Sequence, residues 1–175
     1  KSLANIVEYS LQNGADFLVA LGTTSEAPTL TVEEKNKVVD TIIDTANHRC
    51  PILLGLGGNN TQSVIENIKN QSFDGVDGVL SVVPYYNKPN QNGMFAHFKA
   101  VADASPVPVV LYNVPGRTGV NMQAATTIAL SDHNNIVAIK EASGNIQQIM
   151  EILRDKPSDF TVLSGDDAIT QPLMS

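Results

Sequence analysis

An apolar segment of the chain, residues 136–139, ends in a lysine, Lys140. Burial penalises the charged form of an amine, so a lysine in this position is least costly when it is neutral. A neutral amine is also the form that attacks a carbonyl carbon to give a Schiff base. Because side chains alternate along a strand, we expect Lys140 to share the inner face with Ile136 and Ala138, while Glu141 points the other way. The alternative is a lysine at the rim whose amine reaches solvent.

A second apolar segment, Leu111-Tyr112-Asn113-Val114-Pro115-Gly116-Arg117, carries a phenol and a guanidinium at its end. Tyr112 precedes Lys140 by 28 residues, about one strand–helix unit, so both side chains could point into one site. A phenol there could move protons to and from a carbinolamine. The planar fork of Arg117 suits a substrate carboxylate. A core tyrosine and a surface ion pair are the structural alternatives.

Small polar residues mark three further segment ends. Hydroxyls and free N–H groups in Gly22-Thr23-Thr24-Ser25-Glu26 could cradle a carboxylate, although ordinary turn chemistry would also explain them. The pair Tyr85-Tyr86, between two prolines, predicts either an interface anchor or a contribution to the site. Gly165 would let a ligand approach the backbone closely.

The residue pattern supports neither a metal site nor a nucleophilic triad. The three histidines, His48, His97 and His133, are scattered singly, without the spacing of a metal site. The pair Asp166-Asp167 is typical of a helix cap. We therefore expect no metal and no cofactor.

The elements that must position these residues are visible as six short apolar runs, each 24 to 35 residues after the previous one. Runs of this length, rich in Val, Ile and Leu, predict strands buried on both faces. The runs are Asp16–Leu21, Pro51–Leu56, Gly78–Val83, Pro108–Val114, Ile136–Ala142 and Phe160–Gly165.

Amphipathic helices are expected between these runs. Thr31 with Glu34 forms a capping-box pattern, Asn145 is a candidate N-cap, and Asn13-Gly14 is a typical helix stop. Alternating strands and helices predict an α/β fold with a parallel sheet, either a closed (β/α)8 TIM barrel or an open doubly wound sheet. The segment Gly55–Asn60 lacks the last glycine of a dinucleotide fingerprint, and polar residues follow almost every strand, so the barrel is favoured.

Size, charge and cysteine content restrict the class of protein. The 175 residues predict one domain, 1–175, a partial barrel that lacks a first strand and the C-terminal βα units, because a whole barrel needs about 250 residues. A net charge of −7 disfavours nucleic acid and anionic membranes as partners. No apolar run approaches the roughly 20 residues of a membrane span. The lone Cys50 cannot form an internal disulfide, so a cytoplasmic location is expected.

Five segments in order resemble motifs of the dihydrodipicolinate synthase family, which belongs to the pyruvate-dependent Schiff-base aldolases that include N-acetylneuraminate lyase. They are GTTSEAPTL, PYYNKP, LYNVPGRTG, IKEASGN and LSGDD, and the resemblance extends from Lys1 to Ser175. It implies a lyase of lysine and diaminopimelate biosynthesis that condenses pyruvate with L-aspartate 4-semialdehyde to give 4-hydroxy-tetrahydrodipicolinate. It also implies a homo-oligomer, commonly a dimer of dimers.

The resemblance implies roles for residues at matching motif positions. Lys140 matches the Schiff-base lysine and Tyr112 the proton-transferring tyrosine. Thr23 and Tyr86 match the other members of a hydroxyl relay, with Tyr86 reaching across a dimer interface into the neighbouring site. Of the substrate-binding positions, Thr24 matches the residue that holds the pyruvate carboxylate, Arg117 the one that receives the semialdehyde carboxylate, and Gly165 a glycine lining the mouth.

Several positions depart from the family pattern. Ser25 stands where the family usually has glycine, so the backbone of that turn is expected to differ slightly. In the cleft where regulated members bind lysine, Tyr85 and Asn59 match. The expected glutamate, however, is Ser63, and the two histidine positions hold Val32 and Lys35. Without that carboxylate the effector ammonium loses a charged partner, which predicts weak or absent inhibition by lysine.

Two other functions remain open at the level of sequence. One is a related lyase or 2-oxo acid aldolase that uses the same lysine on another aldehyde. Sialic-acid lyases typically lack the arginine of the turn after YNVP, so Arg117 favours the synthase. The other is a barrel that binds a metabolite or partner without turnover.

Overall fold

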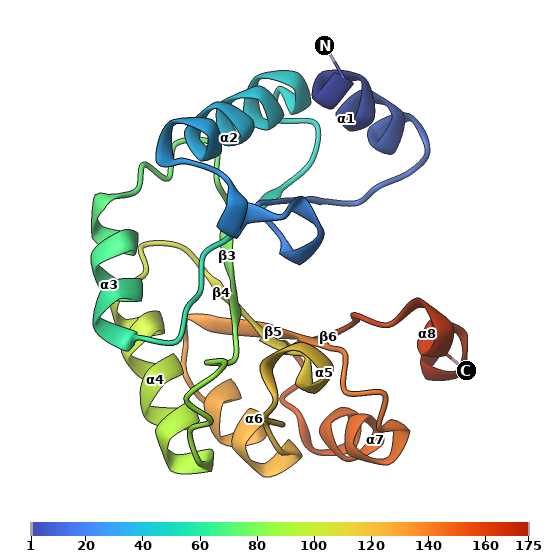
Figure 1. Ribbon diagram of the computed structural model, residues 1–175. Coiled ribbons are helices and arrows are strands. Elements are labelled where there is room, and N and C mark those ends of the chain that lie inside the picture. Colours follow the sequence, from blue (N-terminus) through green and yellow to red (C-terminus); the bar gives the residue numbers. More distant parts are fainter. Residues whose placement is uncertain (1, 175) are drawn as a thin grey trace.

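The computed structural model describes residues 2–174 and contains six parallel strands that alternate with helices (Figure 1). Lys1 and Ser175, the ends of the expected domain, lie outside the described residues. Every strand falls within one of the six predicted runs. The strands are β1 Leu18–Ala20, β2 Ile52–Gly55, β3 Gly78–Val82, β4 Val109–Asn113, β5 Ile136–Glu141 and β6 Thr161–Ser164.

Helices occupy the segments between the strands, as the amphipathic patterns predict. The α-helices are α1 Ser2–Gln12, α2 Val32–Ala46, α3 Thr61–Asn70, α4 Gln91–Ala104, α5 Pro115–Thr118, α6 Ala124–Ser131, α7 Ile146–Asp155 and α8 Asp167–Met174. Two 3-10 helices, η1 Thr23–Ser25 and η2 Ala27–Thr29, follow β1. Among the described residues, no helix is long and apolar enough to cross a membrane.

The strands pair in the order of the sequence, β1-β2-β3-β4-β5-β6, and every pairing is parallel. A doubly wound sheet would reverse its strand order at a switch point, and this sheet does not. Figure 1 shows the helices along the outside of an arc of strands, with α1 at one end and α8 at the other. The architecture is part of a (β/α)8 barrel, which confirms the predicted fold class.

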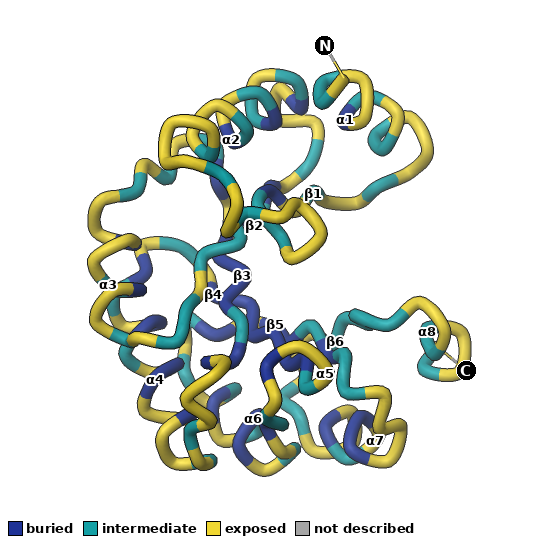
Figure 2. Tube along the Cα trace, viewed as in Figure 1, coloured by how far each residue is buried: buried dark blue, intermediate teal, exposed yellow. Residues whose placement is uncertain are grey.

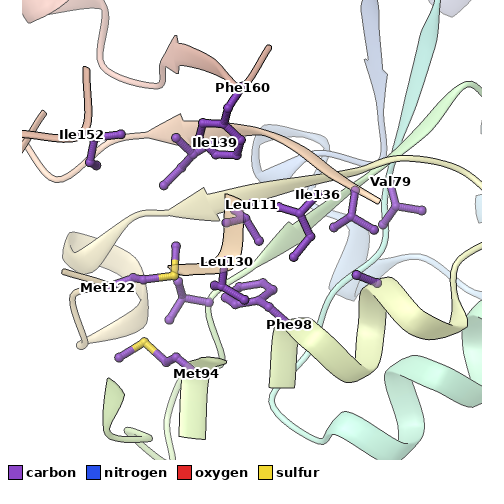
Figure 3. Packing of buried hydrophobic residues seen from close by; sticks show 13 residues of the cluster. Val79, Met94, Phe98, Leu111, Met122, Leu130, Ile136, Ile139, Ile152 and Phe160 are labelled. Atoms are coloured by element: carbon purple, nitrogen blue, oxygen red, sulfur yellow. The ribbon is translucent and has the colours of Figure 1, made fainter. Parts of the chain in front are cut away.

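Apolar side chains pack on both faces of the sheet. On the outer face, Leu111 and Ile139 pack with Phe98 of α4 and Ile152 of α7, all fully buried (Figure 3). On the inner face, a smaller cluster contains Leu80, Val110, Tyr112, Val114 and Ala138. Figure 2 shows that burial is concentrated in β3, β4 and β5 and on the helix faces turned toward them. β3, β4 and β5 are therefore the most buried strands of the sheet.

The placement of Ile136 on the inner face was wrong. The β4–β5 pairing shifts register between Val109, opposite Ile136, and Val110, opposite Ala138. Ile136 consequently packs in the outer cluster (Figure 3). The next residue, Val137, is exposed. A bulge of this kind breaks the two-residue alternation, so counting back from Lys140 fails below Ala138.

The expected helix caps are present. Glu34 N–H donates to Thr31 Oγ1 (3.2 Å) and Thr31 N–H to Glu34 Oε2 (2.9 Å), which completes a capping box at the start of α2. Gln148 N–H donates to Asn145 Oδ1 (3.1 Å) at the start of α7. Helix α1 ends at Gln12, and Gly14 follows with φ +86°.

Candidate active site

The candidate site forms where β4 and β5 end side by side. Tyr112 pairs with Lys140 in the strand register, and both side chains lie on the inner face. Lys140 Nζ lies 4.6 Å from the centroid of the Tyr112 ring. The tyrosine is buried, whereas the lysine is half-buried. Among the described residues, no carboxylate lies within 4.0 Å of the amine. An amine without an ion-pair partner thus rests on an aromatic face at the open end of the sheet.

Gly165 packs against the stem of that lysine. A Cβ atom at this position would lie 3.1 Å from Lys140 Cγ and Cε and 2.9 Å from Ala142 Cβ. The Gly165 N–H donates to the Glu141 carbonyl (2.7 Å), which holds the β6 end beside β5. The missing side chain therefore makes room for Lys140.

A pocket of about 250 Å³ opens beside Tyr112. Thr23, Arg117 and Tyr85 are among the residues that line it, together with glycines of the β1 and β2 ends. Three of the predicted site residues, Thr23, Tyr112 and Arg117, are thereby brought to one cavity from two strand ends, those of β1 and β4. The other four predicted residues, Lys140, Thr24, Tyr86 and Gly165, are not among its lining residues.

The turn after β1 presents unpaired donors. Ser25 N–H donates to the Gly22 carbonyl (3.0 Å), and Ser25 Oγ donates to the same oxygen (2.5 Å). In the part of the chain that the structure describes, the backbone N–H groups of Thr23 and Thr24 donate no hydrogen bond. Ser25 has no positive φ, so the turn forms without the usual glycine. Two N–H groups and two hydroxyls are available for an anion.

Gly55 sets how closely this turn approaches the sheet. A Cβ at Gly55 would overlap the carbonyl group of Leu21, a residue with φ +55°. Gly55 is also the first glycine of the segment that was compared with the dinucleotide fingerprint. Its missing side chain allows β1 and β2 to approach each other at the rim.

Arg117 lies in the short helix α5, and its side chain is exposed. The predicted structural alternative was a surface ion pair, but within residues 2–174 no carboxylate lies within 4.0 Å of its guanidinium. An unpaired, permanently charged fork at the edge of the pocket suits a carboxylate ligand.

Tyr86 lies outside the pocket beside Tyr112. Its side chain is 87% exposed, and its backbone φ is +72°. Asn87 N–H donates to the Tyr85 carbonyl (2.9 Å), and Asn87 Nδ2 to the Asn59 carbonyl (2.8 Å). The tight turn at Tyr86 is an uncommon conformation for a side chain of this size, and these two bonds hold it.

Sequence reasoning missed a buried polar network on the opposite face of the same strand ends. Asn113 Nδ2 lies 3.1 Å from both oxygens of Glu141, which is fully buried. Gln148 Nε2 (3.2 Å) and the Ser143 N–H (2.7 Å) donate to the same carboxylate. Asn121 Nδ2 donates to Gln148 Oε1 (2.7 Å). The only sequence signal was a pair of polar residues at outward positions in otherwise apolar strands.

A second pocket lies between α2, α3 and β2. It is lined by Val32, Lys35 and Tyr85, three of the residues matched to the family's lysine cleft. Asn59 and Ser63 are not among its lining residues. No charged acceptor is contributed by the lining, because Lys35 is cationic and the other members are apolar or neutral.

His97 is buried between α3 and α4, with Nδ1 2.8 Å from Thr61 Oγ1. Burial lowers the pKa of its imidazole to about 4. Within the described residues, no group of three His, Cys, Asp or Glu side chains could hold a metal.

Parallel strands in sequence order, with a lysine and a tyrosine meeting at their carboxyl ends, define the class of (β/α)8-barrel proteins with a strand-end amine. The chain matches the Dihydrodipicolinate synthetase family over residues 1–175 and belongs to that family.

Its relatives have a consistent name. It is 58% identical over 175 residues to a 4-hydroxy-tetrahydrodipicolinate synthase from Phocaeicola vulgatus, covering 99% of this chain and 59% of that protein. It is 54% identical to the enzyme of that name from Parabacteroides distasonis, covering 100% and 59%. The dihydrodipicolinate synthase from Acinetobacter baumannii, complexed with pyruvate, superposes with a TM-score of 0.94 at 43% identity, covering 99% and 60%. The chain thus spans about 59% of the length of the curated relatives it matches.

Proposed function

We propose that the protein condenses pyruvate with L-aspartate 4-semialdehyde to give 4-hydroxy-tetrahydrodipicolinate, through a Schiff base on Lys140. One observation carries the proposal: an amine without a carboxylate partner lies 4.6 Å from the ring of Tyr112 at the end of β5. The name that relatives at 54% and 58% identity share supports this reaction. The pyruvate bound in the Acinetobacter baumannii relative supports the first substrate.

The reaction begins at the Lys140 amine. Lys140 Nζ attacks the keto carbon of pyruvate, and the carbinolamine loses water to give an imine. Loss of a methyl proton gives an enamine, whose carbon attacks the aldehyde carbon of the semialdehyde. The amino group of the semialdehyde then displaces the lysine from the imine carbon, which closes the ring and restores the free amine. Each step moves a proton, and we assign that task to Tyr112, whose ring lies 4.6 Å from the amine.

The remaining residues are assigned to one substrate or to the other. Thr24 and the free N–H groups of its turn hold the pyruvate carboxylate, while Arg117 receives the carboxylate of the semialdehyde. Thr23 joins Tyr112 in the proton relay, since both line the same pocket. Gly165 leaves space for the lysine stem and for the ligand at the mouth.

Tyr86 completes the relay of a second subunit. Its outward side chain and uncommon backbone conformation support a contact with a partner copy. We therefore propose a homo-oligomer, a dimer of dimers as in the family pattern, located in the cytoplasm with the rest of amino-acid biosynthesis.

The experiment that tests the proposal is borohydride reduction in the presence of pyruvate, followed by peptide mass mapping of the full-length protein. We expect a stable adduct on Lys140 and none in a Lys140→Met variant. The matched control is Lys156→Met, which removes another half-buried lysine and should keep the adduct. Labelling of another residue, or no labelling of the parent protein, would overturn the proposal.

A variant at Arg117 tests whether the protein is the synthase or a related aldolase. The Arg117→Ala variant should lose turnover with aspartate semialdehyde by about tenfold to a hundredfold, since a charge-assisted pair is worth about 1.5 to 3 kcal/mol. Pyruvate trapping on Lys140 should persist. An equal loss with uncharged aldehydes would favour the other aldolases.

A further inference from the structure

We infer that Asn113 and Glu141 are positioning residues for this reaction: their buried pairing fixes how Tyr112 is set against Lys140. The inference rests on the proposed function, because it concerns the geometry of the same amine and hydroxyl. Neither residue faces the pocket, so both act through their neighbours in the chain.

The two pairs are consecutive rungs of one strand pairing. Tyr112 lies opposite Lys140 on the inner face, and Asn113 lies opposite Glu141 on the outer face. Side chains alternate along each strand, so the outer pair sits directly behind the inner one. Any slip between the ends of β4 and β5 would separate both pairs together.

The pairing of β4 with β5 needs a directional contact to fix its alignment. Its register shifts between Val109 and Val110, so the amino-terminal half of the pairing does not dictate the alignment of the other half. Apolar packing by Leu111 and Ile139 buries area but is non-directional. A hydrogen bond is directional and fails when the partners shift by an ångström or more. The Asn113–Glu141 pairing, at 3.1 Å to both oxygens, specifies one alignment.

The orientation of each group in the network is determined by its neighbours. Met122 N–H donates to Asn113 Oδ1 (3.0 Å), which turns the Asn113 amide nitrogen toward Glu141. The groups that face the Glu141 carboxylate are all donors, from Asn113, Gln148 and Ser143. A carboxylate with only donors around it cannot be replaced by an amide without opposing two donors.

The network also reaches the segment that carries Arg117. Asn113 Nδ2 donates to Asn121 Oδ1 (2.8 Å), and Gln148 Nε2 donates to the Met122 carbonyl (3.1 Å). Helix α5 and its turn are thus tied at one end to β4 and at the other to this network. A single buried cluster thus contacts the segments that carry Lys140, Tyr112 and Arg117.

The test compares the full-length parent with Glu141→Gln and Gln148→Met. Gln148→Met removes the amide that donates to Glu141 and accepts from Asn121, keeps the volume and leaves the Glu141 carboxylate in place, so it guards against a Glu141 variant that fails to fold. The matched control is Ile149→Val, a fully buried neighbour in α7 outside the network. The measurements are melting temperature, pyruvate KM, and kcat per site that borohydride and pyruvate can trap.

We expect Glu141→Gln to lower kcat per trappable site by about tenfold to a hundredfold, the usual cost of small misplacements of reacting groups. Gln148→Met should lower it by more than about twofold. Pyruvate KM should change little, because the network does not contact the Thr23–Ser25 turn. Ile149→Val should lower melting temperature alone.

Failure of the proposed function and failure of the positioning role give different results. A parent protein that pyruvate and borohydride do not label overturns the proposed function and this inference with it. A labelled parent whose Glu141 and Gln148 variants keep the parental kcat per trappable site, with only a lower melting temperature, overturns the positioning role alone.

Discussion

At the residue scale, Tyr112 offers two separable contributions, an aromatic face and a hydroxyl. The face lies 4.6 Å from the Lys140 amine, and a phenylalanine would keep it. The hydroxyl makes no hydrogen bond within residues 2–174, so its loss leaves no structural partner unsatisfied. The side chain can therefore be tested for chemistry with little effect on folding.

We predict that Tyr112→Phe lowers kcat by about a hundredfold to ten-thousandfold, the usual contribution of a positioned acid or base. Steady-state kinetics with both substrates measures the loss, and thermal unfolding should show an unchanged melting temperature. A variant that kept the full rate would refute the proton-relay assignment.

Gly165 is the residue that limits the volume available to Lys140. We predict that Gly165→Ala slows imine formation and costs about 1 to 3 kcal/mol of stability, because its Cβ would crowd Ala142 and the lysine stem. Pre-steady-state trapping by borohydride measures the rate, and chemical denaturation the stability. The control is Gly116→Ala, where an added Cβ has no neighbour within 4 Å. Equal rates in both variants would argue against crowding.

At the element scale, α3 and α4 are joined by a buried histidine. The pKa of His97 is lowered by burial to about 4, whereas an unfolded histidine titrates near 6.5. The unfolded chain therefore binds more protons between these values. The contribution of His97 is complete above pH 6.5 and is lost as the pH falls through this window toward 4.

The free energy of unfolding should accordingly fall by about 2 kcal/mol between pH 7 and pH 5 on account of this group. Urea unfolding of the full-length protein at several pH values measures the slope. His97→Asn should flatten the slope, while His48→Asn, at an exposed position with φ +58°, should keep it. The same slope in all three proteins would contradict the assignment.

Three positions matched to the family's lysine cleft, Val32, Lys35 and Tyr85, line the cleft between α2 and α3. Its lining includes Lys35 and Val32 and provides no carboxylate for an effector ammonium. We predict that lysine inhibits weakly or not at all, as judged from initial rates at increasing lysine concentration. Half-inhibition by millimolar lysine would defeat the prediction.

At the scale of the whole molecule, the chain's own fold does not bring Tyr86 to Lys140. Tyr86 is 87% exposed, although Thr23, Tyr112 and Arg117 meet at one pocket. The proposed relay therefore needs Tyr86 from a neighbouring subunit. Oligomerisation would then be a condition of activity.

Subunit mixing tests this. Unfolding and refolding Tyr86→Ala together with Lys140→Met should restore about a quarter of the parental activity, because half the dimers are hybrids with one intact site. The control mixes Lys140→Met with Tyr112→Phe, which act in the same subunit and should not complement. Absence of recovery in a verified hybrid would place Tyr86 outside the partner's site.

The sequence by itself determined the features that depend on neighbours along the chain. Apolar runs located all six strands, and the capping box at Thr31 and Glu34 located the start of α2. Alternation placed Lys140 on the inner face and Glu141 on the outer face. These inferences succeeded because periodicity and capping are set by residues a few positions apart.

Only the tertiary structure decided what depends on pairing between distant segments. The register shift that moves Ile136 to the outer layer arises between two strands, so no pattern within one strand encodes it. The bond between Asn113 and Glu141, 28 residues apart, and the contact of Gly165 with Lys140 exist because parallel strands end at the same rim. Which side chains meet there depends on alignment across the sheet, and that alignment is fixed by packing of the entire fold.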